Sequence, residues 1–99
     1  RVGEEGPAGG VVSGASSAPL YDGGRLAARG EIVVVTVGFR LGALGSLFAP
    51  DHAATNVSLR DQMQALRWVR EEIGAFGGDP EAVTVAGQSS GAVAIACLV

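Results

Sequence analysis

The sequence predicts an α/β fold in which a mostly parallel sheet is built from a strand, a helix, a second strand and a second helix. Three observations indicate this order. Residues 32–37 form a continuous β-branched run, which is typical of strands buried on both faces. Residues 59–73 repeat apolar side chains at helical spacing, and residues 82–86 form a second short strand followed by a small, apolar run at 92–99. The connection between the strands should be a right-handed crossover.

Composition excludes several classes of protein. The chain has 99 residues, of which 47% are hydrophobic and 17% charged, which excludes a disordered tail. The net charge is −3 and the seven cations are scattered arginines, so we expect no nucleic-acid partner. One cysteine, Cys97, excludes an internal disulfide. We interpret Cys97 as a buried, small hydrophobic residue, and we expect no metal and no cofactor.

The uncharged run at residues 82–99 is long enough to be considered as a membrane span. Its middle contains Gly87-Gln88-Ser89-Ser90-Gly91, with two glycines and three polar side chains. A strand, a sharp turn and a helix explain this pattern better, so no membrane span is expected.

Two stretches lack a sustained period. Residues 1–30 are rich in Gly, Ala, Ser and Pro and are interpreted as loop, with a turn at 21–24 and a short helical turn at 25–29. Residues 39–56 are also interpreted as irregular. Two strands and one and a half helices do not cover both faces of a parallel sheet, so we expect the chain to be an excerpt of a larger domain.

The helix at 59–73 is the clearest element. Ser58 is a candidate N-cap, and Gly77-Gly78-Asp79-Pro80 ends the helix and turns the chain. Trp68 is predicted to pack against the sheet. The apolar face comprises Leu59, Met63, Leu66, Val69 (or Trp68) and Ile73, and the polar face comprises Arg60, Gln64, Arg67 and Glu71.

Residues 87–91 fit the pattern G-x-S-x-G. This spacing suits a nucleophilic serine, because a tight turn between strand and helix exposes the serine hydroxyl at the carboxyl end of the sheet. The flanking glycines are needed because the neighbouring chain passes too close for a side chain. The following helix directs free N–H groups toward a developing oxyanion. On local sequence alone, the alternative is a Gly/Ser turn in which Ser89 only caps the helix.

Four further segments carry a resemblance to a known family. Residues 56–62, 65–70, 76–80 and 83–91 resemble, in order and spacing, the motifs N-x-G-L-x-D-Q, A-L-x-W-V, F-G-G-D-P and V-T-x-x-G-E-S-A-G of the type-B carboxylesterases, which include the cholinesterases and related lipases. Residues 39–42 similarly resemble Y-R-L-G. The resemblance spans about residue 7 to residue 99. It implies that residues 1–99 are part of an α/β-hydrolase domain, with an oxyanion-loop region at 1–30 and a βαβ unit with the nucleophile elbow at 31–99.

The resemblance also implies a function. Ser89 would be the nucleophile of a carboxylic ester hydrolase that forms an acyl-enzyme and releases it to water. Residues 7–11 resemble the motif H-G-G-G-F, so the backbone N–H groups of Gly9, Gly10 and Ser90 would form the oxyanion hole. The partner implied is a small-molecule carboxylic ester.

Several positions depart from the family pattern. Pro7, Ala8 and Val11 replace motif residues in the oxyanion loop, and no apolar strand precedes that loop, because residues 1–6 read R-V-G-E-E-G. Gln88 replaces a glutamate beside the nucleophile, and because an amide cannot offset the charge of an imidazolium, we expect lower activity. In this fold the triad acid and histidine follow the serine, so we expect both beyond Val99.

These departures leave alternatives open. His52 precedes Ser89 and is interpreted as a surface residue, so a nucleophile without a general base is expected within these residues. A catalytically inactive, cholinesterase-like interaction module and a truncated, nonfunctional product remain alternatives to the esterase. Asp61 is interpreted as a structural carboxylate near a helix start, and we predict that it pairs with Arg40.

Overall fold

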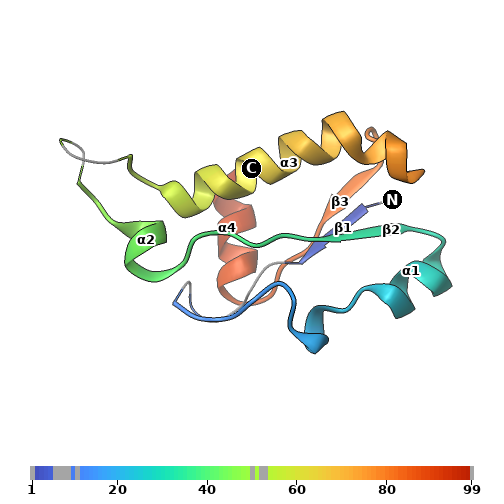
Figure 1. Cartoon of the computed structure of the whole chain (residues 1–99), viewed down its shortest axis with the longest axis horizontal. Helices are drawn as coiled ribbons and strands as arrows, with labels where there is room; N and C mark the ends of the chain where they lie inside the picture. Colours follow the sequence, from blue (N-terminus) through green and yellow to red (C-terminus); the bar gives the residue numbers. More distant parts are fainter. Residues whose placement is uncertain (1, 6–9, 11, 50, 52–53, 99) are drawn as a thin grey trace.

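A computed structural model describes residues 2–5, 10, 12–49, 51 and 54–98. Its centre is a parallel, three-stranded sheet made of β1 (Val2–Glu5), β2 (Val33–Thr36) and β3 (Val83–Val85). The strands lie in the order β2-β1-β3, so the first strand in the sequence lies between the two later ones (Figure 1). Val2 is aligned with Val33 on one side and with Val83 on the other.

Strand β1 corrects the interpretation of residues 1–30 as loop and of residues 1–6 as lacking a strand. The sequence Val-Gly-Glu-Glu shows neither alternation nor a β-branched run. It is nevertheless a strand because it pairs with β2 and β3, which are rich in β-branched residues. Strand formation depends more on the neighbouring strands than on intrinsic propensity. The strands at 32–37 and 82–86 were predicted, and β2 and β3 lie within those ranges.

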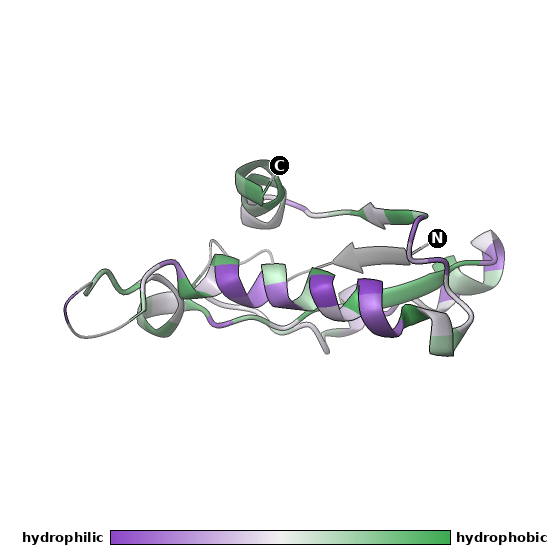
Figure 2. Ribbon diagram, turned by 90° about the horizontal axis from the view of Figure 1, so that it is seen from above, coloured by the Kyte–Doolittle hydropathy of each residue, from purple (hydrophilic) through white to green (hydrophobic). Residues whose placement is uncertain are grey.

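Helix α3 (Val57–Glu72) connects β2 to β3 and continues into the 3-10 helix η2 (Ile73–Phe76). It lies along one face of the sheet (Figures 1 and 2). Val69 and Ile73 are each only 1% exposed and pack against Val33, Val35 and Val83. Burial of side chains of this size contributes about 1.5–3 kcal/mol each, so this contact is the main apolar core of the described residues.

The buried stripe of α3 is rotated from the predicted one. Val69 and Ile73 are buried as expected, but Met63 is 43% exposed and Gln62 is only 8% exposed. The reason is that α3 contacts helices on its flank as well as the sheet, so the side facing them is buried although it is polar. Ser58 does not cap the helix. It is a buried residue of the first turn, and Asn56, in a left-handed conformation with φ of 53°, is the N-cap.

Trp68 does not pack against the sheet. Its side chain is 42% exposed and its ring lies 5.9 Å from the ring of Phe76, measured between centroids. The aromatic pair therefore lies on the outer side of α3 and η2.

The opposite face of the sheet carries α1 (Gly24–Gly30), preceded by the 3-10 helix η1 (Pro19–Tyr21). Helix α1 contacts β2. A Cβ on Gly23 would overlap the side chain of Val34, which shows how closely the start of α1 approaches the strand. Alternate residues of β2 thus face the two layers, Val34 toward α1 and its neighbours Val33 and Val35 toward α3.

Helix α2 (Gly42–Ser46) lies within residues 39–56, and so corrects the expectation that this stretch is irregular. It contacts α3, and Gly45 is buried where a Cβ would overlap the carbonyl oxygen of Arg40. Five residues with two glycines carry no detectable helical period, and so short a helix depends on its tertiary contacts.

Helix α4 (Ser90–Leu98) follows β3 and contacts α3. Figure 2 shows it as almost uniformly hydrophobic, in contrast to the alternating polar and apolar turns of α3. Cys97 is exposed, which corrects the expectation of a buried residue. A helix that is apolar on all sides gives no indication of which side faces the core. Within the described residues, none of the helices has both the length and the apolarity needed to cross a membrane.

Candidate active site

The turn between β3 and α4 is short and strained. β3 ends at Val85 and α4 begins at Ser90. Ser89 has a φ of 55°, in the left-handed region that L-residues other than glycine rarely adopt. Two backbone hydrogen bonds fix the turn, from the Gly91 N–H to the Gln88 carbonyl (3.0 Å) and from the Val93 N–H to the Ser89 carbonyl (3.2 Å). Strain of this kind costs about 1–3 kcal/mol and is concentrated at functional sites.

The two glycines of the turn differ in what they do. A Cβ on Gly87 would lie 2.7 Å from the carbonyl carbon of Gly91 and 2.9 Å from the Ala92 nitrogen, so the start of α4 passes directly against Gly87. A Cβ on Gly91 would meet no heavy atom within 4 Å, although the residue is buried. Position 87 therefore requires glycine, because any side chain there would collide with the backbone of Gly91. At position 91 it is the backbone, and not the missing side chain, that contacts Gly87.

Ser89 and Ser90 face different environments. Ser89 is exposed at the carboxyl end of β3, in front of the N-terminus of α4. The first amides of a helix have no acceptor within the helix, so the N–H groups at the start of α4 are available to a developing negative charge. The side-chain oxygen of Ser90 is buried and has no hydrogen-bond partner in the described structure.

The proposed oxyanion loop follows β1 in the chain. Gly10 is exposed and has a φ of 65°, a conformation that suits glycine. Gly9 and its neighbours Pro7, Ala8 and Val11 lie outside the described residues, as does His52. Because β1 and β3 are adjacent and parallel, their carboxyl ends lie at the same edge of the sheet (Figure 1). The topology thus places the end of β1, at Glu5, and the Ser89 turn at the same edge.

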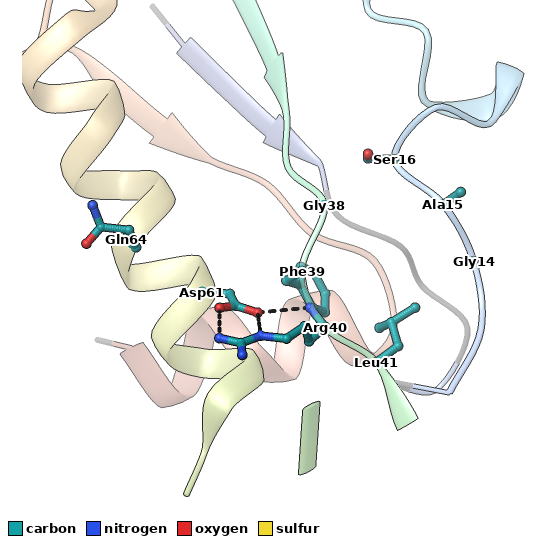
Figure 3. A pocket seen from close by; sticks show the side chains of 9 residues that line it. All are labelled: Gly14, Ala15, Ser16, Gly38, Phe39, Arg40, Leu41, Asp61 and Gln64. Atoms are coloured by element: carbon teal, nitrogen blue, oxygen red, sulfur yellow. Dashed lines mark hydrogen bonds and ion pairs between the residues drawn. The ribbon is translucent and has the colours of Figure 1, made fainter. Parts of the chain in front are cut away.

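Arg40 and Asp61 form the predicted ion pair. The Arg40 Nη2 lies 2.6 Å from Asp61 Oδ1 and the Arg40 Nε lies 2.8 Å from Oδ2, so the interaction is bidentate. The backbone N–H of Arg40 also donates to Oδ2 at 3.0 Å (Figure 3). These hydrogen bonds from Arg40 lower the pKa of the Asp61 carboxyl, and the same pairing raises the pKa of Arg40.

A cleft of about 550 Å³ lies beside this pair, between the segment after β2, the first turns of α3 and residues 14–16 (Figure 3). Its lining does not include Ser89. It comprises Gly14, Ala15, Ser16, Gly38, Phe39, Arg40, Leu41, Asp61 and Gln64. Within the described part of the chain, no group of three or more His, Cys, Asp or Glu side chains is arranged to hold a metal ion.

Solved structures share this arrangement. A thermophilic p-nitrobenzyl esterase matches with a TM-score of 0.93 and 50% sequence identity, covering 98% of this chain and 21% of that protein. A carboxylesterase from Geobacillus stearothermophilus matches with a TM-score of 0.90 and 41% identity over 95% of this chain and 22% of its own length. These esterases have the α/β-hydrolase fold, which is therefore the fold class of this chain.

Sequence comparison gives the family. The model of the carboxylesterase family matches residues 7–99, and the chain belongs to that family. The para-nitrobenzyl esterase of Bacillus subtilis (strain 168) is 53% identical over 88 residues, which are 86% of this chain and 18% of the relative. Cholinesterase 1 of Branchiostoma lanceolatum is 49% identical over 88 residues (88% of this chain and 25% of the relative), and neuroligin-2 of Mus musculus is 49% identical over 81 residues (81% and 10%). The chain thus spans a quarter or less of the length of these relatives.

Proposed function

We propose that residues 1–99 are the nucleophile-bearing part of a carboxylic ester hydrolase. The observation that carries the proposal is the left-handed conformation of Ser89 between a strand and a helix, in a chain of the carboxylesterase family. In finer terms, the proposal assigns an oxyanion-loop region to residues 1–30 and a βαβ unit with the nucleophile elbow to residues 31–99.

In this proposal the Ser89 Oγ attacks the carbonyl carbon of a small-molecule carboxylic ester. The electron pair of the carbonyl moves to its oxygen, and the backbone N–H groups of Gly9, Gly10 and Ser90 stabilise that oxyanion. Collapse of the tetrahedral intermediate releases the alcohol and leaves an acyl group on Ser89, which water then hydrolyses to the acid. The proton of Ser89 passes to a histidine oriented by an acidic residue, both supplied after Ser89 in the chain order of this fold, and the histidine gives that proton to the departing alcohol.

The alternative is a catalytically inactive interaction module. The observation in its favour is the uncharged Gln88 beside Ser89 in place of the glutamate of the family motif. The relatives include neuroligin-2 as well as esterases, so similarity of sequence is compatible with either reading. The third alternative, a truncated and nonfunctional product, depends on whether the natural chain continues past Val99.

The first experiment reads the transcript past the codon for Val99. An open frame that encodes an acidic residue and a histidine in family context supports the esterase, and a stop codon at that point favours the nonfunctional product. The second experiment measures p-nitrophenyl ester turnover in the longest natural chain that contains these residues. Ser89→Ala should abolish turnover, and Ser46→Ala is the matched control on an exposed serine outside the proposed oxyanion-loop region. Unchanged turnover in Ser89→Ala would reject the nucleophile.

A further inference from the structure

A second cavity, of about 320 Å³, lies between α2, α3 and α4 and is distinct from the cleft beside Arg40 and Asp61. Its volume is at the lower end of the range for small-molecule sites. None of its lining residues, all within the described part of the chain, carries a charge. They are Phe39, Gly45, Ser46, Asn56, Ser58, Leu59, Gln62, Ser90, Val93, Ala94 and Cys97.

Polar side chains without partners converge on this cavity. Ser58 is 7% exposed and Gln62 is 8% exposed, and they are the buried polar residues of the described structure. Neither side chain makes a hydrogen bond with another described residue. Ser90, whose buried hydroxyl is also unpartnered, belongs to the same lining. Among these three, the Ser90 Oγ is the polar atom that is itself buried without a partner in the described residues, and Ser58 and Gln62 are buried residues of the same lining. Buried polar atoms are almost always hydrogen-bonded in native proteins, so this hydroxyl indicates that an occupant of the cavity supplies the missing partner.

The lining also defines the chemistry of that occupant. A glutamine amide presents two donors and one acceptor, and it is best complemented by a group that both accepts and donates. Phe39, Leu59 and Val93 give the remaining wall an apolar character. With no cation or anion in the wall, a charged ligand would lose its hydration without compensation.

We propose that this cavity is a binding site for a small, uncharged molecule that has an apolar body and an amide or hydroxyl group directed at Gln62. Ser89 is exposed and does not belong to the lining, whereas the neighbouring Ser90, whose backbone N–H is assigned to the oxyanion hole, does. Ser89→Ala should therefore bind the ligand as the unaltered chain does.

Benzamide and benzoate test the proposal as a matched pair, since they share a ring and differ in charge and donor capacity. Binding to the longest natural chain that contains these residues is followed by NMR, through the side-chain NH2 signals of Gln62. Benzamide should shift these signals and bind at least about tenfold more tightly than benzoate. Cys97 lies in the lining and is exposed, so benzamide should also slow its alkylation by iodoacetamide.

Two glutamines on α3 provide matched variants. Gln62→Met keeps the side-chain volume and removes the hydrogen-bonding groups, and it should weaken benzamide binding about tenfold, equivalent to about 1.4 kcal/mol. Gln64→Met is the control, because Gln64 is exposed and lines the other cleft. Ser58→Ala, a small change at a helical position, should weaken binding about threefold.

Three results would overturn the proposal. The first is equal binding of benzamide and benzoate. The second is unchanged affinity in Gln62→Met with an unaltered circular dichroism spectrum. The third is protection of Cys97 that rises with protein concentration without benzamide, which would assign the cavity to contact between copies of the chain. If Gln62→Met does not fold, Ser58→Ala and Cys97 protection in the unaltered chain decide the outcome.

Discussion

The guanidinium of Arg40 and the carboxylate of Asp61 join the segment after β2 to the first turns of α3 through two charge-assisted hydrogen bonds, and the Arg40 backbone N–H adds a third. One carboxylate thereby fixes both the side chain and the main chain of Arg40. Because Gly45 packs against the Arg40 carbonyl, the same contact also positions α2.

Stability should fall at acid pH because of this pair. The pKa of Asp61 is lowered in the folded state by its hydrogen bonds to Arg40. The contribution of the ion pair to the free energy of unfolding is therefore fully present above the unfolded-state pKa of the carboxyl. It is lost as pH falls through the lower, folded-state pKa. Chemical denaturation between pH 2 and pH 6 measures this loss. In Asp61→Asn the pH dependence should be weaker, and an unchanged pH profile would contradict the assignment.

Backbone strain at Ser89 predicts an order of stability among variants. Ser89→Gly should be more stable than Ser89→Ala by about 1 kcal/mol, because the left-handed region costs an L-residue about 1–2 kcal/mol and costs glycine none. Thermal unfolding of the two variants, both lacking the nucleophilic hydroxyl, gives the difference. Equal midpoints would show that the turn relaxes away from a φ of 55°.

Gly87 should not tolerate a methyl group. Gly87→Ala places a Cβ 2.7 Å from the backbone of Gly91, so β3 and α4 would have to separate, and we expect a loss of at least about 2 kcal/mol. Gly74→Ala is the matched control, since a Cβ at Gly74 meets no atom within 4 Å and alanine favours a helix by about 0.5–1 kcal/mol. Denaturant midpoints of the two variants should shift in opposite directions.

The core contact of α3 predicts a contrast between two apolar residues on one helical segment. Ile73→Ala removes a side chain that is 1% exposed and should cost about 2–5 kcal/mol. Met63→Ala removes a side chain that is 43% exposed and should change stability by no more than about 0.5 kcal/mol. Similar losses for both variants in urea titrations would mean that Met63 is covered in solution.

Periodic elements were predictable from sequence, and elements defined by their neighbours were not. β2, α3, β3 and the start of α4 carry either a β-branched run, a helical repeat or a small, apolar run. β1 carries none of these signals, because its two flanking strands, rather than its own residues, make it a strand. The same limit applies to α2, which is too short to show a period.

The candidate site shows the same division. The spacing of the two glycines around Ser89 predicted the turn, and the ion pair between Arg40 and Asp61 was predicted from two charges in otherwise uncharged motifs. The burial of Gln62 was not, because it depends on the helices that flank α3. Cys97 was placed wrongly because the uniform apolarity of α4 does not distinguish its sides.

The central position of β1 has a consequence for how the chain acquires its structure. β1 pairs with two strands at very different distances along the sequence, because Val2 is aligned with Val33 in β2 and with Val83 in β3. During synthesis the residues of the β1–β2 ladder are available early, but the β1–β3 ladder cannot form until the residues up to Val85 have left the ribosome. Pairing of such distant segments slows folding, because the loop-closure entropy is lost before the contacts form. Until then the free edge of β1 is open to pairing with other chains.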